Sequence, residues 1–180
     1  MRIKIVSSYD DMSKEASKII ASQVRSDPHS TLGLATGGTP IGTYKELIRM
    51  HQEGQLDFSS VVTFNVDEYI GLSHDHSQSY HYFMHKNFFN HVNIDTKNIH
   101  VPDGLAKDID GFCKNYEQEI RDHGGIDLQL LGIGRDGHIA FNEPGSSLGS
   151  RTRLIVLAEE TLSDNARFFE KREDVPRFAI

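Results

Sequence analysis

Acidic and imidazole side chains crowd into one short segment of this sequence, between Leu131 and Gly145. Asp136, His138 and Glu143 lie there among several glycines. A histidine flanked by two carboxylates can hold a defined tautomer and move protons near neutral pH. We therefore predict an acid–base function for His138, in preference to a purely structural one, with Asp136 and Glu143 beside it.

The same segment contains the spacing Gly132-x-Gly134-x-x-Gly137, which matches the glycine pattern of dinucleotide-binding folds. In those folds the glycines open a helix within the first strand–helix–strand unit. Residues 138–145 include a proline and a glycine and carry no helical pattern. We reject dinucleotide binding for this reason.

A second acidic pair, Asp67 and Glu68, directly follows the apolar run Val61–Val66. Adjacent carboxylates at a partly buried position raise the pKa of at least one of them, as a general base that acts on carbon at neutral pH requires. A solvated pair at the start of a loop explains the same residues. Taken alone, the pattern favours the solvated pair.

A polar loop with paired glycines separates the apolar run Leu32–Ala35 from a helical pattern that starts near Pro40. Glycines allow a ligand to approach the backbone, and the N–H groups at the start of a helix favour an anion. The alternative is an ordinary turn, with Thr39 as the N-cap and Pro40 at the first helical position. The candidate phosphate-binding residues are Thr36, Gly37, Gly38 and Thr39.

Short apolar runs and amphipathic stretches alternate along the chain. The expected strands are Ile3–Val6, Leu32–Ala35, Val61–Val66, Ile126–Leu131 and Leu154–Leu157. The expected helices are Asp11–Val24, one opened by Thr39 and Pro40, Ser79–Phe89, and Asp108–His123, which ends at Gly124 and Gly125. This alternation predicts a mainly parallel α/β sheet with helices on both faces and ligands beyond the carboxyl ends of its strands.

We expect one domain over 1–180. Residues 176–180 read as the start of another parallel strand, and such a strand without neighbours leaves backbone groups unpaired. The sequence therefore predicts a fold that lacks its last C-terminal elements.

The composition excludes several classes of protein. The formal charge of -7 argues against nucleic acid or an anionic membrane as a partner, and no apolar run approaches the ~20 residues of a membrane span. Cys113 is the only cysteine, and no signal-peptide core follows Met1, so we expect a cytoplasmic protein. His81 and His85 have the spacing of metal ligands on a helix, but no HExxH pattern is present, and we favour a non-metal pair.

Taken together, these loops resemble those of the glucosamine-6-phosphate deaminases. The resemblance extends over essentially the whole chain and is carried by LGLATGGTP, VVTFNVDEY, SYHYFMHKNFF, GIGRDGHIAFNEPGSSLGSRTR and NARFF. It implies a Rossmann-like three-layer αβα sandwich, shared with 6-phosphogluconolactonase. It also implies the conversion of glucosamine 6-phosphate to fructose 6-phosphate and ammonia in amino-sugar catabolism, without metal or organic cofactor, in a monomer or a homo-oligomer.

The resemblance assigns roles by position. Asp67 matches the general base that moves a proton between C2 and C1, and His138 matches the group that opens the sugar ring, oriented by Asp136 and Glu143. Arg167 matches a phosphate ligand within a mobile lid, which corresponds to about 151–172. The family also uses a lysine on a later strand, which this sequence does not reach.

One departure from the family pattern concerns regulation. Some members bind an acetylated amino-sugar phosphate at a separate site through two basic residues. Arg153 occupies the first of these positions here, but Ile155 occupies the second and cannot bind an anion. We therefore expect weak or absent activation of that kind.

Two rival functions share the fold. A 6-phosphogluconolactonase also has a Gly-x-Asp-Gly-His core, but its pattern lacks an acid at the place of Glu143. Sugar-phosphate-sensing domains of transcription regulators commonly lose the catalytic residues and follow a helix-turn-helix, for which there is no room before Leu32. The resemblance favours the deaminase over both.

Overall fold

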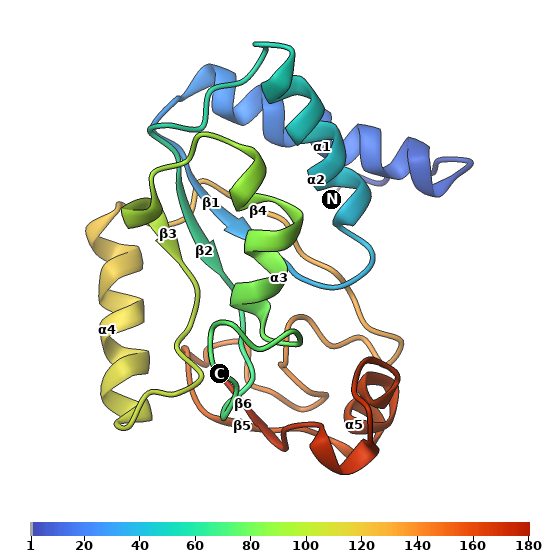
Figure 1. The fold of residues 1–180 in the computed structure, drawn as a ribbon, viewed down its shortest axis with the longest axis vertical. Coiled ribbons are helices and arrows are strands. Elements are labelled where there is room, and N and C mark those ends of the chain that lie inside the picture. The colour runs from blue at the N-terminus through green and yellow to red at the C-terminus, as the bar shows by residue number, and fades with distance from the viewer. Residues whose placement is uncertain (1) are drawn as a thin grey trace.

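The computed structural model describes residues 2–180 and shows a parallel sheet between two layers of helices (Figure 1). The helices are α1 (Tyr9–Ser26), α2 (Ile41–Gln52), α3 (Tyr80–Asn87), α4 (Ile109–Asp122) and α5 (Glu159–Asn165). The strands are β1 (Thr31–Leu34), β2 (Val62–Asn65), β3 (Ile99–His100), β4 (Leu128–Gln129), β5 (Ile155–Val156) and β6 (Phe178–Ala179). Short 3₁₀ helices cover Phe89–His91, Thr96–Asn98, Ala166–Phe168 and Arg172–Asp174.

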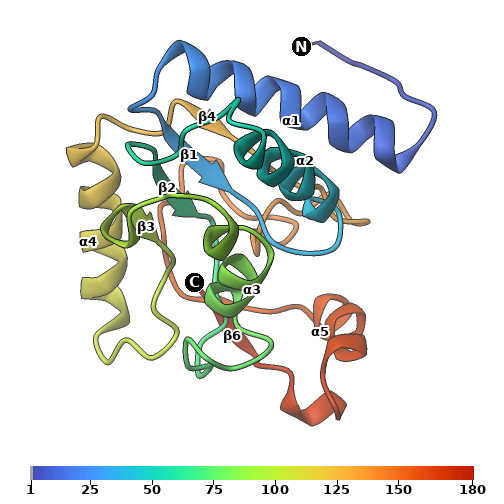
Figure 2. The same ribbon diagram turned by 45° about the horizontal axis from the view of Figure 1, so that its top comes forward.

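The main sheet has 4 strands in the order β3-β2-β1-β4, and all of its pairings are parallel. Helices α1, α2 and α3 lie on one side of it, and α4 lies on the other (Figures 1 and 2). This arrangement confirms the predicted three-layer α/β architecture. None of the helices described between residues 2 and 180 is long and apolar enough to cross a membrane.

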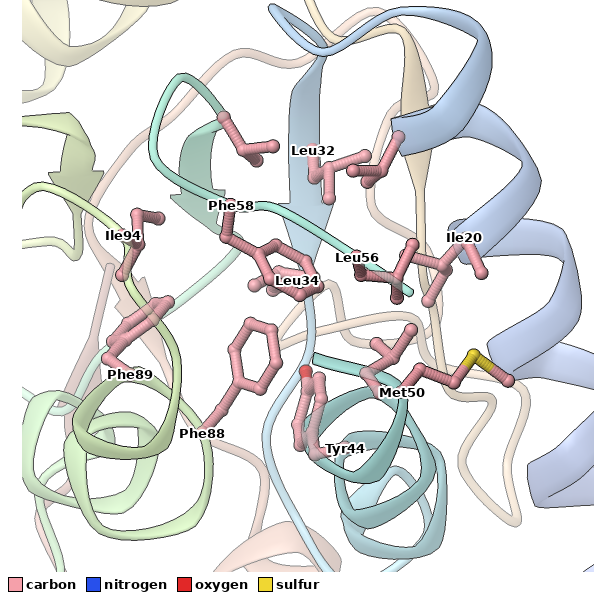
Figure 3. Close-up of a cluster of buried hydrophobic side chains, with 14 of the residues drawn as sticks. Ile20, Leu32, Leu34, Tyr44, Met50, Leu56, Phe58, Phe88, Phe89 and Ile94 are labelled. Atoms are coloured by element: carbon pink, nitrogen blue, oxygen red, sulfur yellow. The ribbon is translucent and has the colours of Figure 1, made fainter. Parts of the chain in front are cut away.

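The larger hydrophobic core lies between the sheet and helices α1, α2 and α3 (Figure 3). Leu32 and Leu34 of β1 are both 1% exposed. The ring of Phe88 stacks on Tyr44 of α2 at 5.0 Å and meets Phe58 edge to face at 5.4 Å. Both β1 and β2 are buried along their whole length, as expected of parallel strands that are covered on both faces, although Thr31, Thr63 and Asn65 are polar.

A smaller core lies on the opposite face, between β2 and α4. Phe64 packs against Tyr116 of α4 and stacks on His100 of β3 with centroids 4.3 Å apart. The Tyr116 hydroxyl donates to the carbonyl oxygens of Asn65 (2.8 Å) and His100 (3.1 Å). These hydrogen bonds attach helix α4 to the carboxyl end of β2, two residues before the candidate base Asp67.

Helix termini largely follow the sequence signals. The Ser79 side chain caps α3, and the Asp108 side chain caps α4, which ends before two glycines with positive φ. Helix α3 ends at Asn87, so the predicted end at Phe89 falls in the 3₁₀ helix that follows.

Two predictions at the N-terminal side are wrong. Helix α2 begins at Ile41 with Pro40 in the N-cap position, and no side chain caps it, so Thr39 is not the cap. Ile3–Val6 is not a strand: Ile3 and Ile5 are 72% and 92% exposed. Their alternation has the period of a strand, but a strand also needs a partner edge, and within residues 2–180 none pairs with this segment.

The strand expected at 176–180 is present but antiparallel. Phe178 and Ala179 of β6 pair with β5, and the other edge of the segment bonds to the loop after β2. There, Glu68 and Ile180 exchange two backbone hydrogen bonds of 3.1 and 2.9 Å. The backbone groups that were expected to remain unpaired are satisfied locally in this way.

The main core gives a stability prediction. Leu47 of α2 is fully buried, whereas Ile19 of α1 is 60% exposed. We expect Leu47→Ala to lower the free energy of unfolding by about 2–5 kcal/mol, because it removes a packed side chain and leaves a cavity. Ile19→Ala is the aliphatic control and should cost less than about 1 kcal/mol. Equal losses from the two variants in denaturant titrations would contradict the placement of α2 against the sheet.

Candidate active site

The candidate site lies beyond the carboxyl ends of β1, β2 and β4. Because these neighbouring strands are parallel, the loops that follow them emerge at one edge of the sheet. Aromatic rings join the loops. The centroid of the Tyr69 ring lies 5.1 Å from that of Phe141 and 5.0 Å from that of Tyr80 in α3, and the ring of Tyr80 stacks on that of Phe141 with centroids 5.8 Å apart. The segment after β2 is thereby packed against the segment after β4.

Asp67 lies at the first turn beyond β2 and is 6% exposed. Its Oδ1 atom is buried and has no hydrogen-bond partner within residues 2–180. Burial raises the pKa of Asp67 to about 8, and the negative charge of Glu68 adds to the shift. The pair is therefore buried and not solvated, which excludes the alternative of a solvated pair at the start of a loop. A buried carboxyl with a raised pKa can take a proton from carbon near neutral pH.

Glu68 has a different environment from its neighbour. Its Oε1 accepts from the backbone N–H groups of Tyr69 (2.8 Å) and Tyr80 (2.9 Å), and its Oε2 accepts from that of His81 (2.9 Å). Burial raises the pKa of Glu68, and these N–H groups act against the shift. The carboxylate ties the loop to the start of α3, which fixes the backbone on which Asp67 lies.

His138 and Asp136 form a close pair on the loop after β4. Oδ1 of Asp136 lies 2.7 Å from Nδ1 of His138 and also accepts from the His138 backbone N–H at 3.2 Å. That backbone hydrogen bond is the main cause that lowers the pKa of Asp136, so the carboxylate is charged beside the ring. Nδ1 is buried and forms no hydrogen bond of good geometry within residues 2–180, so its contact with Asp136 is a close charge contact, and Nε2 is left for chemistry.

The glycines of this loop shape the space for the imidazole. A Cβ atom at Gly134 would come within 2.4 Å of the His138 ring. The Gly134 N–H donates to the His138 carbonyl at 2.8 Å, and Gly137 has a φ of 90°. The glycine spacing that resembles a dinucleotide motif therefore serves to fold a tight loop around His138.

Glu143 approaches the same pair from further along the loop. One ligand atom from each of Asp136, His138 and Glu143 lies within 4.8 Å of the others. Oε1 of Glu143 accepts from the Ala158 N–H (3.0 Å) and the Thr161 hydroxyl (2.7 Å), whereas Oε2 is buried and has no partner within residues 2–180.

The carboxylate oxygens of Asp136 and Glu143 and the imidazole nitrogens of His138 are also atoms that commonly bind metal cations. In the arrangement seen, the Asp136 carboxylate already contacts His138, and Oε1 of Glu143 already has two donors. These existing contacts occupy donor atoms that a cation would need. His81 and His85, the other candidate metal pair, lie with rings 4.5 Å apart, and His81 stacks on His74 at 4.1 Å.

The glycine loop after β1 is open to solvent at Gly37, Gly38 and Thr39. Gly37 has a φ of 95°, and a Cβ atom at either glycine would meet nothing within 4 Å. The Tyr9 hydroxyl donates to the Gly38 carbonyl at 3.1 Å and accepts from the Gly42 N–H at 2.8 Å, which holds the loop against α1.

The remaining candidates for phosphate binding are Thr36 and Arg167. Thr36 lies near Tyr80: burial raises the pKa of Tyr80 well above its ordinary value, and contact with the Thr36 side chain acts against the shift. Arg167 is exposed in the 3₁₀ helix after α5, with its guanidinium 4.7 Å from the centre of the Phe168 ring. Within residues 2–180 it forms no ion pair, so its charge is available to an anion.

Several residues that build the site were not singled out from the sequence. They make contacts that join segments distant in the chain: the N–H groups of Tyr80 and His81 that donate to Glu68, the ring cluster of Tyr69, Tyr80 and Phe141, and the bridge made by Tyr9. The sequence does predict a helix capped by Ser79 a few residues after the acidic pair. It gives no signal that the first N–H groups of this helix donate to Glu68.

A parallel α/β sheet with acid–base side chains on the loops beyond its strands defines an α/β enzyme that binds a small ligand at the strand ends. A family model described as "Glucosamine-6-phosphate isomerases/6-phosphogluconolactonase" matches residues 7–167. The chain belongs to this family.

Relatives named glucosamine-6-phosphate deaminase match the whole chain. The protein from Thermoanaerobacter sp. (strain X514) is 54% identical over 180 residues, which are 100% of this chain and 71% of the relative. That from Clostridium perfringens (strain 13 / Type A) is 56% identical, and the match covers 74% of its length.

Solved structures agree with the fold. A monomeric glucosamine-6-phosphate deaminase is 45% identical with a TM-score of 0.97, over 99% of this chain and 74% of the other. A 6-phosphogluconolactonase from Thermotoga maritima is 24% identical with a TM-score of 0.70, over 87% of this chain and 71% of the other, and this likeness supports the fold alone.

The buried base gives a pH prediction. The pKa of Asp67 rises from 3.8 to about 8 in the folded protein. Its contribution to stability is complete below about pH 4 and is lost as pH rises toward 8, because the unfolded chain releases the proton first.

We therefore expect Asp67→Asn to be more stable than the original protein at neutral pH. The difference should widen between pH 4 and 8 by at most about 1.4 kcal/mol per pH unit. Denaturant titrations at several pH values measure this, with Ile19→Ala as a control that changes no titrating group. A difference that does not vary with pH would show that Asp67 ionises normally.

Proposed function

We propose that this protein converts glucosamine 6-phosphate and water to fructose 6-phosphate and ammonia. One observation carries the proposal: a buried carboxyl, Asp67, with an oxygen free of partners, lies on a loop that is packed against the loop of Asp136 and His138. Identity of 54% and 56% over the full chain to deaminases favours this reaction within the family.

The first step is opening of the sugar ring. It requires a proton to leave the hydroxyl on C1 and a proton to reach the ring oxygen. His138 is the candidate for this exchange, because its Nδ1 lies 2.7 Å from Asp136 and its other nitrogen is left to the substrate. Glu143 supplies a second negative charge within 4.8 Å.

The second step is isomerisation. Asp67 takes the proton from C2 of the open chain and returns it to C1. Together with transfer of a proton from the amine nitrogen to O1, this converts the amino aldehyde to an imine of the ketose. Water then adds to C2 of the imine, and the C–N bond breaks to release ammonia. The carboxylate suits this step because its raised pKa brings the ionisation close to neutral pH.

Phosphate binding is assigned to the loop after β1 and to Arg167. The candidates on the loop are Thr36, Gly37, Gly38 and Thr39. The positive φ of Gly37 and the free space above both glycines allow the backbone to approach an anion. Arg167 belongs to the segment 151–172, which we propose as a lid that closes over the bound phosphate.

The location and regulation follow from the same assignment. We infer a cytoplasmic protein, because the substrate is a phosphorylated sugar and Cys113 is buried and unpaired. Ile155 lies in β5, where a second cation would be needed for an acetylated amino-sugar phosphate, so we propose that such a compound does not activate the enzyme.

The reaction is tested by incubation with glucosamine 6-phosphate. We expect equal amounts of ammonia and fructose 6-phosphate, whereas Asp67→Asn should bind the substrate but lose turnover by about 10²-fold or more, because the amide keeps the shape and removes the base. Separate assays with 6-phosphogluconolactone test the rival. Lactone hydrolysis without ammonia would overturn the proposal in favour of the lactonase.

His138 can be separated from Asp67 by the step that it affects. We expect His138→Gln to slow turnover of the cyclic substrate by about 10²-fold, because proton transfer during ring opening loses its imidazole. An open-chain substrate analogue should be affected much less, and the ratio of the two rates measures this. If both substrates slow equally, the ring-opening role belongs to another residue.

A further inference from the structure

The carboxylate of Glu143 connects the loop after β4 to the start of α5. Its Oε1 atom accepts from the Ala158 backbone N–H and from the Thr161 hydroxyl, at 3.0 and 2.7 Å. Ala158 is the N-cap residue of α5, and its side chain caps nothing. The first turn of α5 is therefore held by an acid from a different part of the chain.

The two oxygens of Glu143 have unequal surroundings. Oε1 has both donors, whereas Oε2 is buried without a partner within residues 2–180. A Glu143 oxygen also lies within 4.8 Å of ligand atoms of Asp136 and His138. The hydrogen bonds from α5 thus fix how the carboxylate is turned toward the imidazole.

Packing keeps the Thr161 hydroxyl in place. Thr161 is 5% exposed, and its neighbour Leu162 is 7% exposed. Leu157 and Leu162 belong to the same buried cluster as Tyr69 and Phe141. A hydroxyl on a helix packed this way can move only if α5 moves relative to the site loops.

We propose that Thr161 is a positioning residue for the deamination: its hydroxyl orients Glu143 and holds that negative charge beside His138. The inference rests on the proposed function. It also implies that any motion of α5 relative to the site loops changes the surroundings of Glu143.

The physical basis is the effect of a hydrogen bond on a carboxylate. The Thr161 hydroxyl donates to Oε1 of Glu143 at 2.7 Å, so loss of this hydroxyl should let the carboxylate turn away from its present position beside His138. The titrating groups near it are Asp136 and His138 on its own loop. On α5, Glu159 and Glu160 occupy the first turn and are exposed.

The test compares Thr161→Val, which removes the hydroxyl and keeps the shape, with Thr161→Ser, which keeps the hydroxyl. The chain offers a matched control in Thr152, whose backbone N–H and hydroxyl both donate to Oε1 of Glu117 at 2.9 Å. Thr152→Val removes the same type of contact within 151–172, on the side of α4. The measurements are kcat, KM, the pH dependence of kcat, and the unfolding temperature.

We expect Thr161→Val to lower kcat by about 10- to 100-fold, which corresponds to loss of a hydrogen bond to a charged group. KM should change by less than about threefold. The acidic limb of the kcat profile should stay in place, because it reports ionisation of Asp67, whose pKa is about 8. Thr161→Ser should restore most of kcat. Thr152→Val should not reproduce a fall in kcat at unchanged KM, whatever its effect on the unfolding temperature.

The outcomes separate the inference from the proposed function. If the unsubstituted protein releases no ammonia, the proposed function fails and the positioning role fails with it. If it releases ammonia and Thr161→Val keeps the original kcat, only the inference is overturned. A loss of kcat that occurs equally in Thr161→Ser and Thr152→Val would also overturn it, since it would reflect general disturbance of the segment.

Discussion

Two adjacent carboxylates lie buried at the end of β2, and the rest of the site depends on how they are accommodated. Both side chains cannot be desolvated and charged without partners. Glu68 is stabilised by three backbone N–H groups, two of them at the start of α3. Asp67 has no comparable donors on Oδ1, so burial and its charged neighbour raise its pKa to about 8. Of the two adjacent acids, Glu68 therefore joins the loop to α3, and Asp67 has a pKa close to neutral.

The second constraint is that distant loops must meet around Asp67. Aromatic packing supplies this contact, because Tyr69 beside the acid pair packs against both Tyr80 and Phe141. Phe141 lies between His138 and Glu143 in the chain, so its position also fixes the loop that carries them. A hydrophobic contact thus places the acid–base groups, while hydrogen bonds decide their orientation.

The segment after β4 is also connected to helix α5. Glu143 is bonded to the start of α5, and α5 packs by Leu157 and Leu162 on the same aromatic cluster. Arg167 follows directly after this helix. The proposed phosphate ligand Arg167 and the proposed positioning residue Thr161 therefore lie on consecutive helical turns of one short segment.

The sequence by itself determined the layered fold, because alternating apolar runs and amphipathic helices admit few other arrangements. It also located the acid pair after β2, the Asp136–His138–Glu143 segment and the glycine loop, since residue types and local spacing carry that information. It failed for Ile3–Val6 and for the direction of the strand at 176–180, because strand pairing is a non-local property. Only the tertiary structure decided which carboxylate of the pair is capped, and that α5 donates to Glu143. Those facts depend on segments far apart in the chain, whose approach is set by packing and leaves no mark in local sequence.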